Sequence, residues 1–459
     1  MELPPQAMVN LVEELRAYHA IYSPLFQRRA QREGAAKSLH GLLLEIPRQS
    51  VEPMVLALAG PHAKAVRTLQ LCLSEGAWDD EVLRPRHWPE VDTLLGEDEG
   101  VLPLDGSALL QQGQASVGVN RQDCGEVGKR AHCPAGVSVG YARRQGYPLL
   151  DCRLYMPREW LAEEAYAARR RQCGGPVDLR FKTKPALGWE MIQAVPHTGT
   201  LRARWVSWDE ALGRDTSLLD HLDGLGLWSV AEVPHDTQVW PRRPAPAVPA
   251  WAGQGRKPTR PRVLAGAGEP TEVAQLAASR PTHRWVRPTI KEGSKGPLVA
   301  CVAARRVIAV RGGLPGPEVW LVVRRPLLPG AVKTYLSNAP SDTPVATLVR
   351  LRGMRWPMET CFEDGKQYLG MGDYEVRGGA GGHHHMTLCI LAHGFLVRVC
   401  LKLKKSPGLD PLPGASAVME YPAPARLRCR GSARPRGVLA AAEPRGLSFP
   451  SQAPHSAAR

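Results

Sequence analysis

Residues 100–107, GVLPLDGS, form a short apolar run that ends in a carboxylate, Asp105. Before this stretch the apolar residues recur three and four positions apart, which is typical of helices, and after it strand-like runs begin. A second apolar run, within residues 203–213 (ARWVSWDEALG), leads into another acid, Asp209. Helical stretches lie between these runs, so the pattern predicts an α/β sheet that presents acids at its strand ends.

The N-terminal region, residues 1–98, is predicted to be an all-α domain. Residues 9–22 (VNLVEELRAYHAIY) and 63–78 (AKAVRTLQLCLSEGAW) both carry apolar residues at helical spacing. On the second segment Lys64 and Arg67 fall on the other faces, where they suit contacts with DNA phosphates. The alternative for these two residues is an ordinary solvated helix face.

The remainder of the chain divides by composition. Residues 241–282 are rich in Pro, Gly, Ala and Arg, which predicts an exposed basic linker or loop. Runs such as EVWLVVRR, residues 318–325, then predict an all-β insertion. The predicted organisation has four further segments after the helical domain: the first part of an α/β core, 99–235; the basic linker and β insertion, 236–340; the C-terminal helices of the core, 341–405; and a disordered basic tail, 406–459.

The net charge of the 459-residue chain is +15, which favours a polyanionic partner such as nucleic acid. Ten cysteines are scattered without a CxxC pair, a pattern typical of reduced thiols in the cytosol. The sequence has no signal-peptide pattern and no uninterrupted apolar run of about 18 residues. We therefore expect a cytoplasmic protein that has no membrane partner.

Residues 355–366, RWPMETCFEDGK, place an acid between two bases. Arg355, Glu359 and Lys366 follow one another at helical spacing, so they are predicted to share one helix face. One interpretation is a surface ion pair. The other groups Glu359 with Asp105 and Asp209, because three gathered carboxylates need cations between them, and their hard oxygens favour Mg²⁺ or Mn²⁺. Two such ions would support phosphodiester cleavage or strand transfer.

The same stretch resembles the arginine, glutamate and lysine signature of DDE-type insertion-sequence transposases. Further blocks resemble that family in the expected order, over roughly residues 35–405. The tyrosine that many relatives carry three positions before the helix arginine is Arg352 here. The other matching blocks are SVGVNRQDCGEVGKRAHCPAGVSVGYA, LYMPREWL, FKTKPALGWEMI, WDEALGRD and DYEVRGGAGGHHHMTLCILAHGFL.

The resemblance implies an RNase H-like core that is interrupted by a β-strand insertion. It places the catalytic, metal-binding acids at Asp105, Asp209 and Glu359, with two Mg²⁺ or Mn²⁺ ions, and the basic DNA contacts at Arg355 and Lys366. It also implies that the N-terminal helices bind double-stranded terminal inverted repeats, and that a homodimer pairs two ends before joining them to target DNA. Two alternatives remain: a DNA-binding relic that has lost catalysis, and a host metal-dependent endonuclease.

Overall fold

The helical pattern of the first 98 residues is confirmed. A computed structural model of the protein describes residues 5–405 apart from 111, 112, 114, 126, 175–178, 282–284, 294, 295, 328 and 329. The fifth helix begins where Asp79 Oδ1 accepts a hydrogen bond from the Glu81 backbone N–H, an ordinary helix N-cap. The α-helices of this region, as the structure has them, are α1 (Pro5–Tyr22), α2 (Arg29–Leu42), α3 (Val51–Ala59), α4 (Ala63–Ser74) and α5 (Asp80–Leu95).

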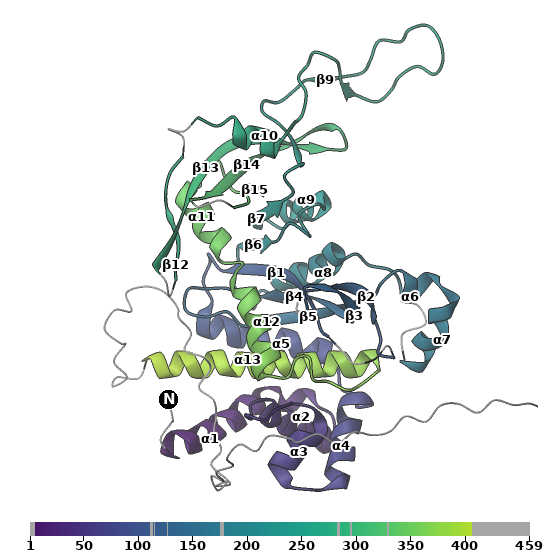
Figure 1. The fold of residues 1–459 in the computed structure, drawn as a ribbon, viewed down its shortest axis with the longest axis vertical. Helices are drawn as coiled ribbons and strands as arrows, with labels where there is room; N and C mark the ends of the chain where they lie inside the picture. The colour runs from purple at the N-terminus through teal and green to yellow at the C-terminus, as the bar shows by residue number, and fades with distance from the viewer. Residues whose placement is uncertain are drawn as a thin grey trace, which may run out of the picture. The chain divides into compact units, whose positions relative to one another are not determined.

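The strands that follow form the centre of a mixed sheet in the order β5-β4-β1-β6-β7 (Figure 1). β1 runs antiparallel to β4 and parallel to β6, which is in turn parallel to β7. This is the strand arrangement of an RNase H-like core, and the predicted fold class is confirmed. The bounds are β1 (Val101–Ala108), β4 (Ala135–Gly140), β5 (Leu149–Tyr155), β6 (Trp205–Trp208) and β7 (Trp228–Val233); a separate hairpin, β2 (Asn120–Cys124) with β3 (Lys129–Cys133), lies between β1 and β4 in the chain.

The predicted β insertion exists, and it continues the core sheet. β15 pairs antiparallel with β7, placing Leu336 opposite Ala231, and β14 and β13 follow, so eleven strands join in the described part of the chain. The pairing covers the edge that β7 would otherwise leave open, with unpaired backbone N–H and C=O groups. The strands are β8 (Gln238–Trp240), β11 (Thr271–Glu272), β12 (Thr289–Gly293), β13 (Gly296–Arg311), β14 (Leu314–Pro326) and β15 (Lys333–Ser337).

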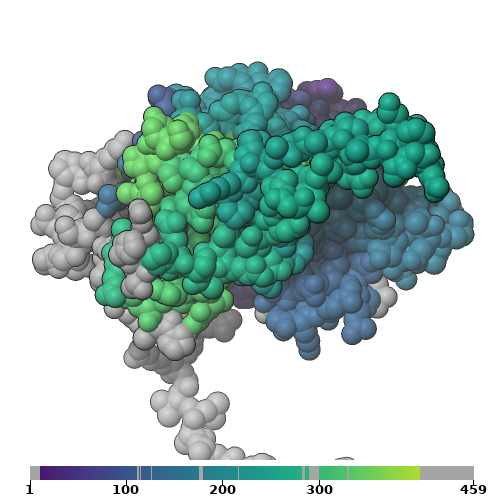
Figure 2. Space-filling view, turned by 90° about the horizontal axis from the view of Figure 1, so that it is seen from above, coloured from purple at the N-terminus to yellow at the C-terminus, as the bar shows by residue number. Residues whose placement is uncertain are grey.

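The prediction of a plain linker over residues 241–282 is partly wrong. β9 (Pro246–Ala247) and β10 (Arg262–Val263) pair to form the stem of an exposed hairpin, which stands out as a teal-green ridge in Figure 2. Further on, α10 (Val273–Ala278) buries Val273 in the apolar cluster of the insertion. A short apolar group inside a Pro/Gly-rich segment was enough to build this helix, because the neighbouring strands supply the rest of its core.

The remaining helices cover the core sheet. α8 lies so close to β1 that a Cβ added at Gly188 would stand 2.5 Å from a methyl group of Leu104, so only glycine fits there. The helices are α6 (Glu159–Ala162), α7 (Glu164–Gln172), α8 (Lys184–Thr198), α9 (Thr216–Gly224), α11 (Val345–Gly353), α12 (Pro357–Tyr368) and α13 (Gly379–Lys405).

The long helix α13 joins the N-terminal helices to the sheet. It contacts β5 as well as α2, α4 and α5 (Figure 1). The Tyr18 hydroxyl donates a hydrogen bond to the carbonyl of Leu391 on α13 at 3.0 Å, and the buried ring of His384 stacks on Trp78 with 3.7 Å between ring centroids. The N-terminal helices are therefore packed onto the core in this structure.

By length and composition, the segment Gly379–Leu403 of α13 could also cross a membrane. In the structure 61% of an apolar 18-residue window in that stretch is buried, and the neighbours of the helix are helices and a strand of the same chain, as expected for a core helix. The described residues belong to one compact unit, within which the domain boundaries predicted from the sequence stay predictions. The predicted tail, 406–459, lies outside the described residues.

Candidate active site

Asp105 and Asp209 follow neighbouring positions on adjacent parallel strands. Leu104 of β1 is paired with Trp208, the last residue of β6, so the next residue on each strand is an aspartate. Adjacent strands lie about 4.8 Å apart, which brings the two carboxyl groups close together. Asp209 follows its strand directly, as predicted. Asp105 does not end its strand: β1 continues to Ala108 along β4, and that detail of the prediction is wrong.

A tight turn fixes the backbone of Asp209. Its Oδ1 accepts a hydrogen bond from the Leu212 N–H at 3.2 Å, and its main-chain oxygen accepts one from the Gly213 N–H at 3.1 Å. Aspartate is favoured in such turns because its side chain binds the backbone that follows. A Cβ added at Gly213 would meet the carbonyl oxygen of Glu232, so this turn packs directly against β7.

Glu359 comes from the other side of the site, on α12. The sequence predicted that Arg355, Glu359 and Lys366 share one helix face, and this is wrong for Arg355: α11 ends at Gly353 and α12 begins at Pro357, so Arg355 lies between the two helices. Pro357 accounts for the break between the two helices, because proline has no N–H to continue the hydrogen bonds of α11 and is favoured in the first turn of a helix. Glu359 thus lies in the first turn of α12, where the helix dipole favours a carboxylate.

Arg355 joins the two sides. Its Nη1 donates to Asp105 Oδ2 at 2.8 Å and its Nη2 donates to Glu359 Oε1 at 2.6 Å. The Asp105 side chain is 12% exposed and that of Glu359 is 51% exposed. One guanidinium therefore binds a carboxylate from β1 and a carboxylate from α12 at once, with one acid buried and the other open to solvent.

The electrostatics show how closely the acids are gathered. Burial, followed by repulsion from Asp209, raises the pKa of Asp105 to about 6, while Arg355 works in the opposite direction and Glu359 adds to the rise. Burial lowers the pKa of Arg355, but attraction to the three acids outweighs it and the net pKa is raised. Each predicted acid thus acts on the same guanidinium, as expected of a site built around positive charge.

The other predicted basic residues lie elsewhere. Lys366, near the end of α12, donates from Nζ to the carbonyl oxygen of Ala108 at 2.8 Å, which ties the helix to the far end of β1. Lys64 and Arg67 are exposed on α4, among the N-terminal helices. The DNA-binding roles of all three stay predictions.

Comparison with known families agrees with this geometry. The model of the DDE superfamily endonuclease family matches residues 22–297, more than half of the 459 residues. The chain belongs to that family. A comparison with curated proteins finds no match. The matched range contains Asp105 and Asp209 and ends before Glu359, so for the third acid the structure supplies the link that the family match does not. DDE endonucleases act on DNA and typically use divalent metal ions.

The donor set of this endonuclease fits such ions in type. Asp105, Asp209 and Glu359 offer hard carboxylate oxygens, the ligands that Mg²⁺ and Mn²⁺ prefer. Among the described residues no three acidic, histidine or cysteine side chains are arranged as a ready metal site. The guanidinium of Arg355 lies between two of the carboxylates instead, in the place where positive charge is needed. Binding of metal here would require Arg355 to give up one or both of its ion pairs.

The sequence identified Arg352 only as a departure from the tyrosine of the family, and it did not identify Tyr335, which lies beside Arg352. A small cavity next to it is lined by side chains from β6, β7, β15 and α11, among them Tyr335 and Arg352. Arg352 Nε donates to the Tyr335 hydroxyl at 2.5 Å and its guanidinium lies over the same ring. The helical spacing of Arg352 and Arg355 was a usable signal. Tyr335 gave none, because it comes from the insertion, whose pairing with β7 the sequence did not reveal.

Proposed function

We propose that this endonuclease is a transposase of the DDE type that cuts phosphodiester bonds at the ends of an insertion sequence and joins those ends to target DNA. One observation carries the proposal: Asp105 and Asp209 are neighbours across β1 and β6, and Arg355 links Asp105 to Glu359. The net charge of +15 supports a DNA substrate.

In this proposal Asp105, Asp209 and Glu359 would hold two divalent ions. When bound, such ions supply an activated nucleophile and stabilise the leaving oxygen of an in-line displacement. The protein's own part is to fix the ligands: the sheet holds both aspartates rigidly, and the first turn of α12 holds Glu359. Arg355, once released from the acids, has a planar fork of donors that matches a DNA phosphate. It would then hold the strand that is cut.

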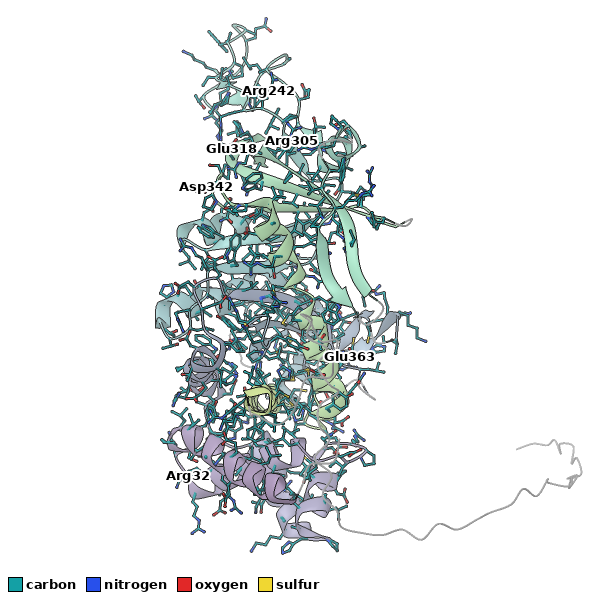
Figure 3. The ribbon with its side chains drawn as sticks, turned by 90° about the vertical axis from the view of Figure 1, so that its left-hand side faces the viewer. Arg32, Arg242, Arg305, Glu318, Asp342 and Glu363 are labelled. Atoms are coloured by element: carbon teal, nitrogen blue, oxygen red, sulfur yellow. The ribbon has the colours of Figure 1, made fainter. Side chains whose placement is uncertain are left out.

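Cleavage of a labelled duplex that carries the end of the element, in Mg²⁺ or Mn²⁺, tests the proposal. Wild type should nick the boundary, and Asp209→Asn and Glu359→Gln should abolish nicking. Glu363→Gln is the matched control, because Glu363 lies one helical turn beyond Glu359 on α12 and is exposed (Figure 3). Its cleavage should stay at the wild-type level.

The other outcomes separate the alternatives. Specific binding of the element's end without cleavage by any of the proteins would identify a DNA-binding relic. Metal-dependent cleavage of any duplex, with no preference for paired terminal repeats, would identify a host endonuclease. Both results would overturn the transposase proposal.

The proposed function also leads us to propose an oligomeric state and a cellular compartment. Joining two ends needs two active sites, so we propose a homodimer in the complex that pairs the ends, acting on DNA in the cytoplasm. The absence of a CxxC pair among the ten cysteines supports a reducing compartment. Analytical ultracentrifugation with and without a duplex carrying the element's end tests the dimer.

A further inference from the structure

The exposed hairpin of the insertion, residues 241–264, is called the basic arm here. It leaves the sheet after β8 and returns before β11, and its stem pairs Ala247 with Arg262 and Pro246 with Val263. Arg243 Nη2 donates to the Gly316 carbonyl at 2.9 Å, which anchors the base of the arm to the beginning of β14. Figure 3 labels Arg242, the neighbouring residue at this base. The arm is thus a projecting element with a defined attachment.

The charge of the basic arm is of one sign. It contains six cations and no Asp or Glu, and within the described residues none of the six has an ion-pair partner. All six are exposed, and the segment 256–262 borders one open hollow. The six are Arg242, Arg243, Arg256, Lys257, Arg260 and Arg262. The six cations repel one another, and binding of a polyanion would reduce this electrostatic repulsion.

The basic arm also exposes apolar surface and is stiffened. Trp251 is 51% exposed and Val248 is 50% exposed, and the indole N–H of Trp251 donates to the Gly255 carbonyl, which orients the ring within the loop. Six prolines restrict the backbone, which lowers the entropy that binding must remove. A purely solvated linker needs neither an exposed tryptophan nor this stiffness.

The sheet separates the arm from the acids. Six strand-to-strand steps lead from β8 to β1, through β13, β14, β15, β7 and β6. At about 4.8 Å a step β8 lies about 29 Å from β1 across the sheet, or roughly eight or nine base pairs of duplex at 3.4 Å each, and the arm projects beyond β8 (Figure 1). A duplex held at the catalytic acids would therefore have to extend about one helical turn or more to reach the arm.

We propose that the basic arm binds the sugar-phosphate backbone of duplex DNA, at a place separate from the catalytic acids. The contact is independent of base sequence, because it is made by cationic side chains with phosphates, and Trp251 adds apolar contact at the tip. This inference rests on the proposed function only in taking duplex DNA as the partner. It needs no cleavage.

The test measures binding of the full chain to a labelled 30-base-pair duplex of arbitrary sequence, in EDTA, at several salt concentrations. Arg256→Gln with Lys257→Gln should lower the slope of log affinity against log salt by about 1.8, since each phosphate contact contributes about 0.9. The ratio of wild-type affinity to variant affinity should therefore be about sixtyfold larger at 0.1 M salt than at 1 M salt. Trp251→Ala should weaken binding without changing the slope.

The matched control removes two exposed arginines from a surface that also carries acids. Arg169→Gln with Arg171→Gln on α7, a helix that begins at Glu164, changes the net charge equally and should leave the slope near the wild-type value. A second arm variant replaces residues 248–261 by Asn-Gly, a two-residue turn that keeps the β9–β10 stem. It should lower the slope at least as much as the double substitution.

Equal slopes for wild type, arm variants and control would overturn the proposal, as would a loss by the control as large as that of the arm variants. A loss of binding to anionic lipid vesicles with DNA binding unchanged would also overturn it, in favour of a membrane surface. These results leave the cleavage test of Asp209 and Glu359 untouched. A result that overturns DNA binding by the basic arm can therefore be distinguished from one that overturns the proposed transposase function.

Discussion

Arg84 and Arg355, two of the described arginines that pair with more than one acid, have different surroundings. Arg84 on α5 is 1% exposed; its Nε lies 2.6 Å from Asp151 of β5, and it also pairs with Asp80. Arg355 is 21% exposed and links Asp105 to Glu359, whose side chain is 51% exposed. Arg84 and Asp151 are closed off from water, although Glu81, 3.9 Å from Arg84, is 69% exposed, whereas the Arg355 cluster is open on the side of α12.

This difference in burial gives the Arg84 cluster a structural role and leaves the Arg355 cluster able to exchange ligands. Arg84 also donates to the Thr387 hydroxyl at 3.1 Å, so it ties α5 to both β5 and α13. Burial raises the pKa of Asp151, and Arg84 and Arg153 counter that rise, so the carboxylate has cations on two sides. A buried charge that loses its partner is strongly destabilising, so this cluster cannot exchange ligands. The Arg355 cluster can, because Glu359 is able to turn to water.

The largest expected effect is on cleavage. Asp105→Asn should lower the rate at least about a thousandfold, because a metal ligand contributes several kcal/mol to the transition state and each 1.36 kcal/mol is tenfold. Asp151→Asn, the matched change in the closed cluster, should destabilise the fold and leave the rate per folded molecule near that of wild type. Rates normalised to the folded fraction, taken from near-UV circular dichroism, check this. A thousandfold loss of cleavage in Asp151→Asn would show that the Arg84 cluster is also needed for cleavage.

The next effect is on stability. Arg84→Met should lower the free energy of unfolding by about 3–5 kcal/mol, because it leaves Asp151 buried without its main partner. Arg355→Met should cost nearer to about 1 kcal/mol at pH 6, because Glu359 faces water and Asp105, with a pKa of about 6, readily takes up a proton. Urea unfolding at pH 6 measures both. Equal losses would show that the two clusters play the same structural role.

Stability should also depend on pH through Asp105. Its folded pKa of about 6 lies above the unfolded value of 3.8, so the native state binds the proton more tightly and its stability falls as pH rises from about 4 to 6. Asp105→Asn removes this loss. In EDTA, the stability of the variant relative to wild type should rise by up to about 3 kcal/mol between pH 4 and pH 8. If the difference in stability between Asp105→Asn and wild type does not change between pH 4 and pH 8, the pKa of Asp105 is not raised by burial and by the neighbouring acids.

A smaller effect should come from packing beneath β1. Gly188→Ala puts a methyl group 2.5 Å from Leu104, next to Asp105, and should cost about 1–3 kcal/mol as the strand or α8 shifts. It should also slow cleavage, because the shift moves the aspartate. Gly224→Ala is the control, since a Cβ there meets nothing within 4 Å. A cleavage rate unchanged by Gly188→Ala would show that the site tolerates movement of its strand.

The sequence predicted the parts of this site and missed how they connect. Apolar runs that end in acids identified Asp105 and Asp209, because that pattern is local. The break of the helix before Pro357 had a local signal, the proline itself, which the prediction did not use. The pairing of β15 with β7 depends on tertiary contacts and was not predicted. The Arg84 cluster was missed for the same reason: Asp151 lies 67 positions away in the chain, and nothing local marks it as a partner.

In the mechanism proposed above, Asp105, Asp209 and Glu359 form one site for divalent cations, with Arg355 between the acids when no cation is bound. Mn²⁺ binding to the full chain, followed by electron paramagnetic resonance of the free ion, tests it directly. Wild type should bind Mn²⁺, each of Asp105→Asn, Asp209→Asn and Glu359→Gln should weaken binding, and Arg355→Gln should strengthen it by removing the competing cation. Equal binding by wild type and all three acid variants, or none by any of them, would contradict the claim.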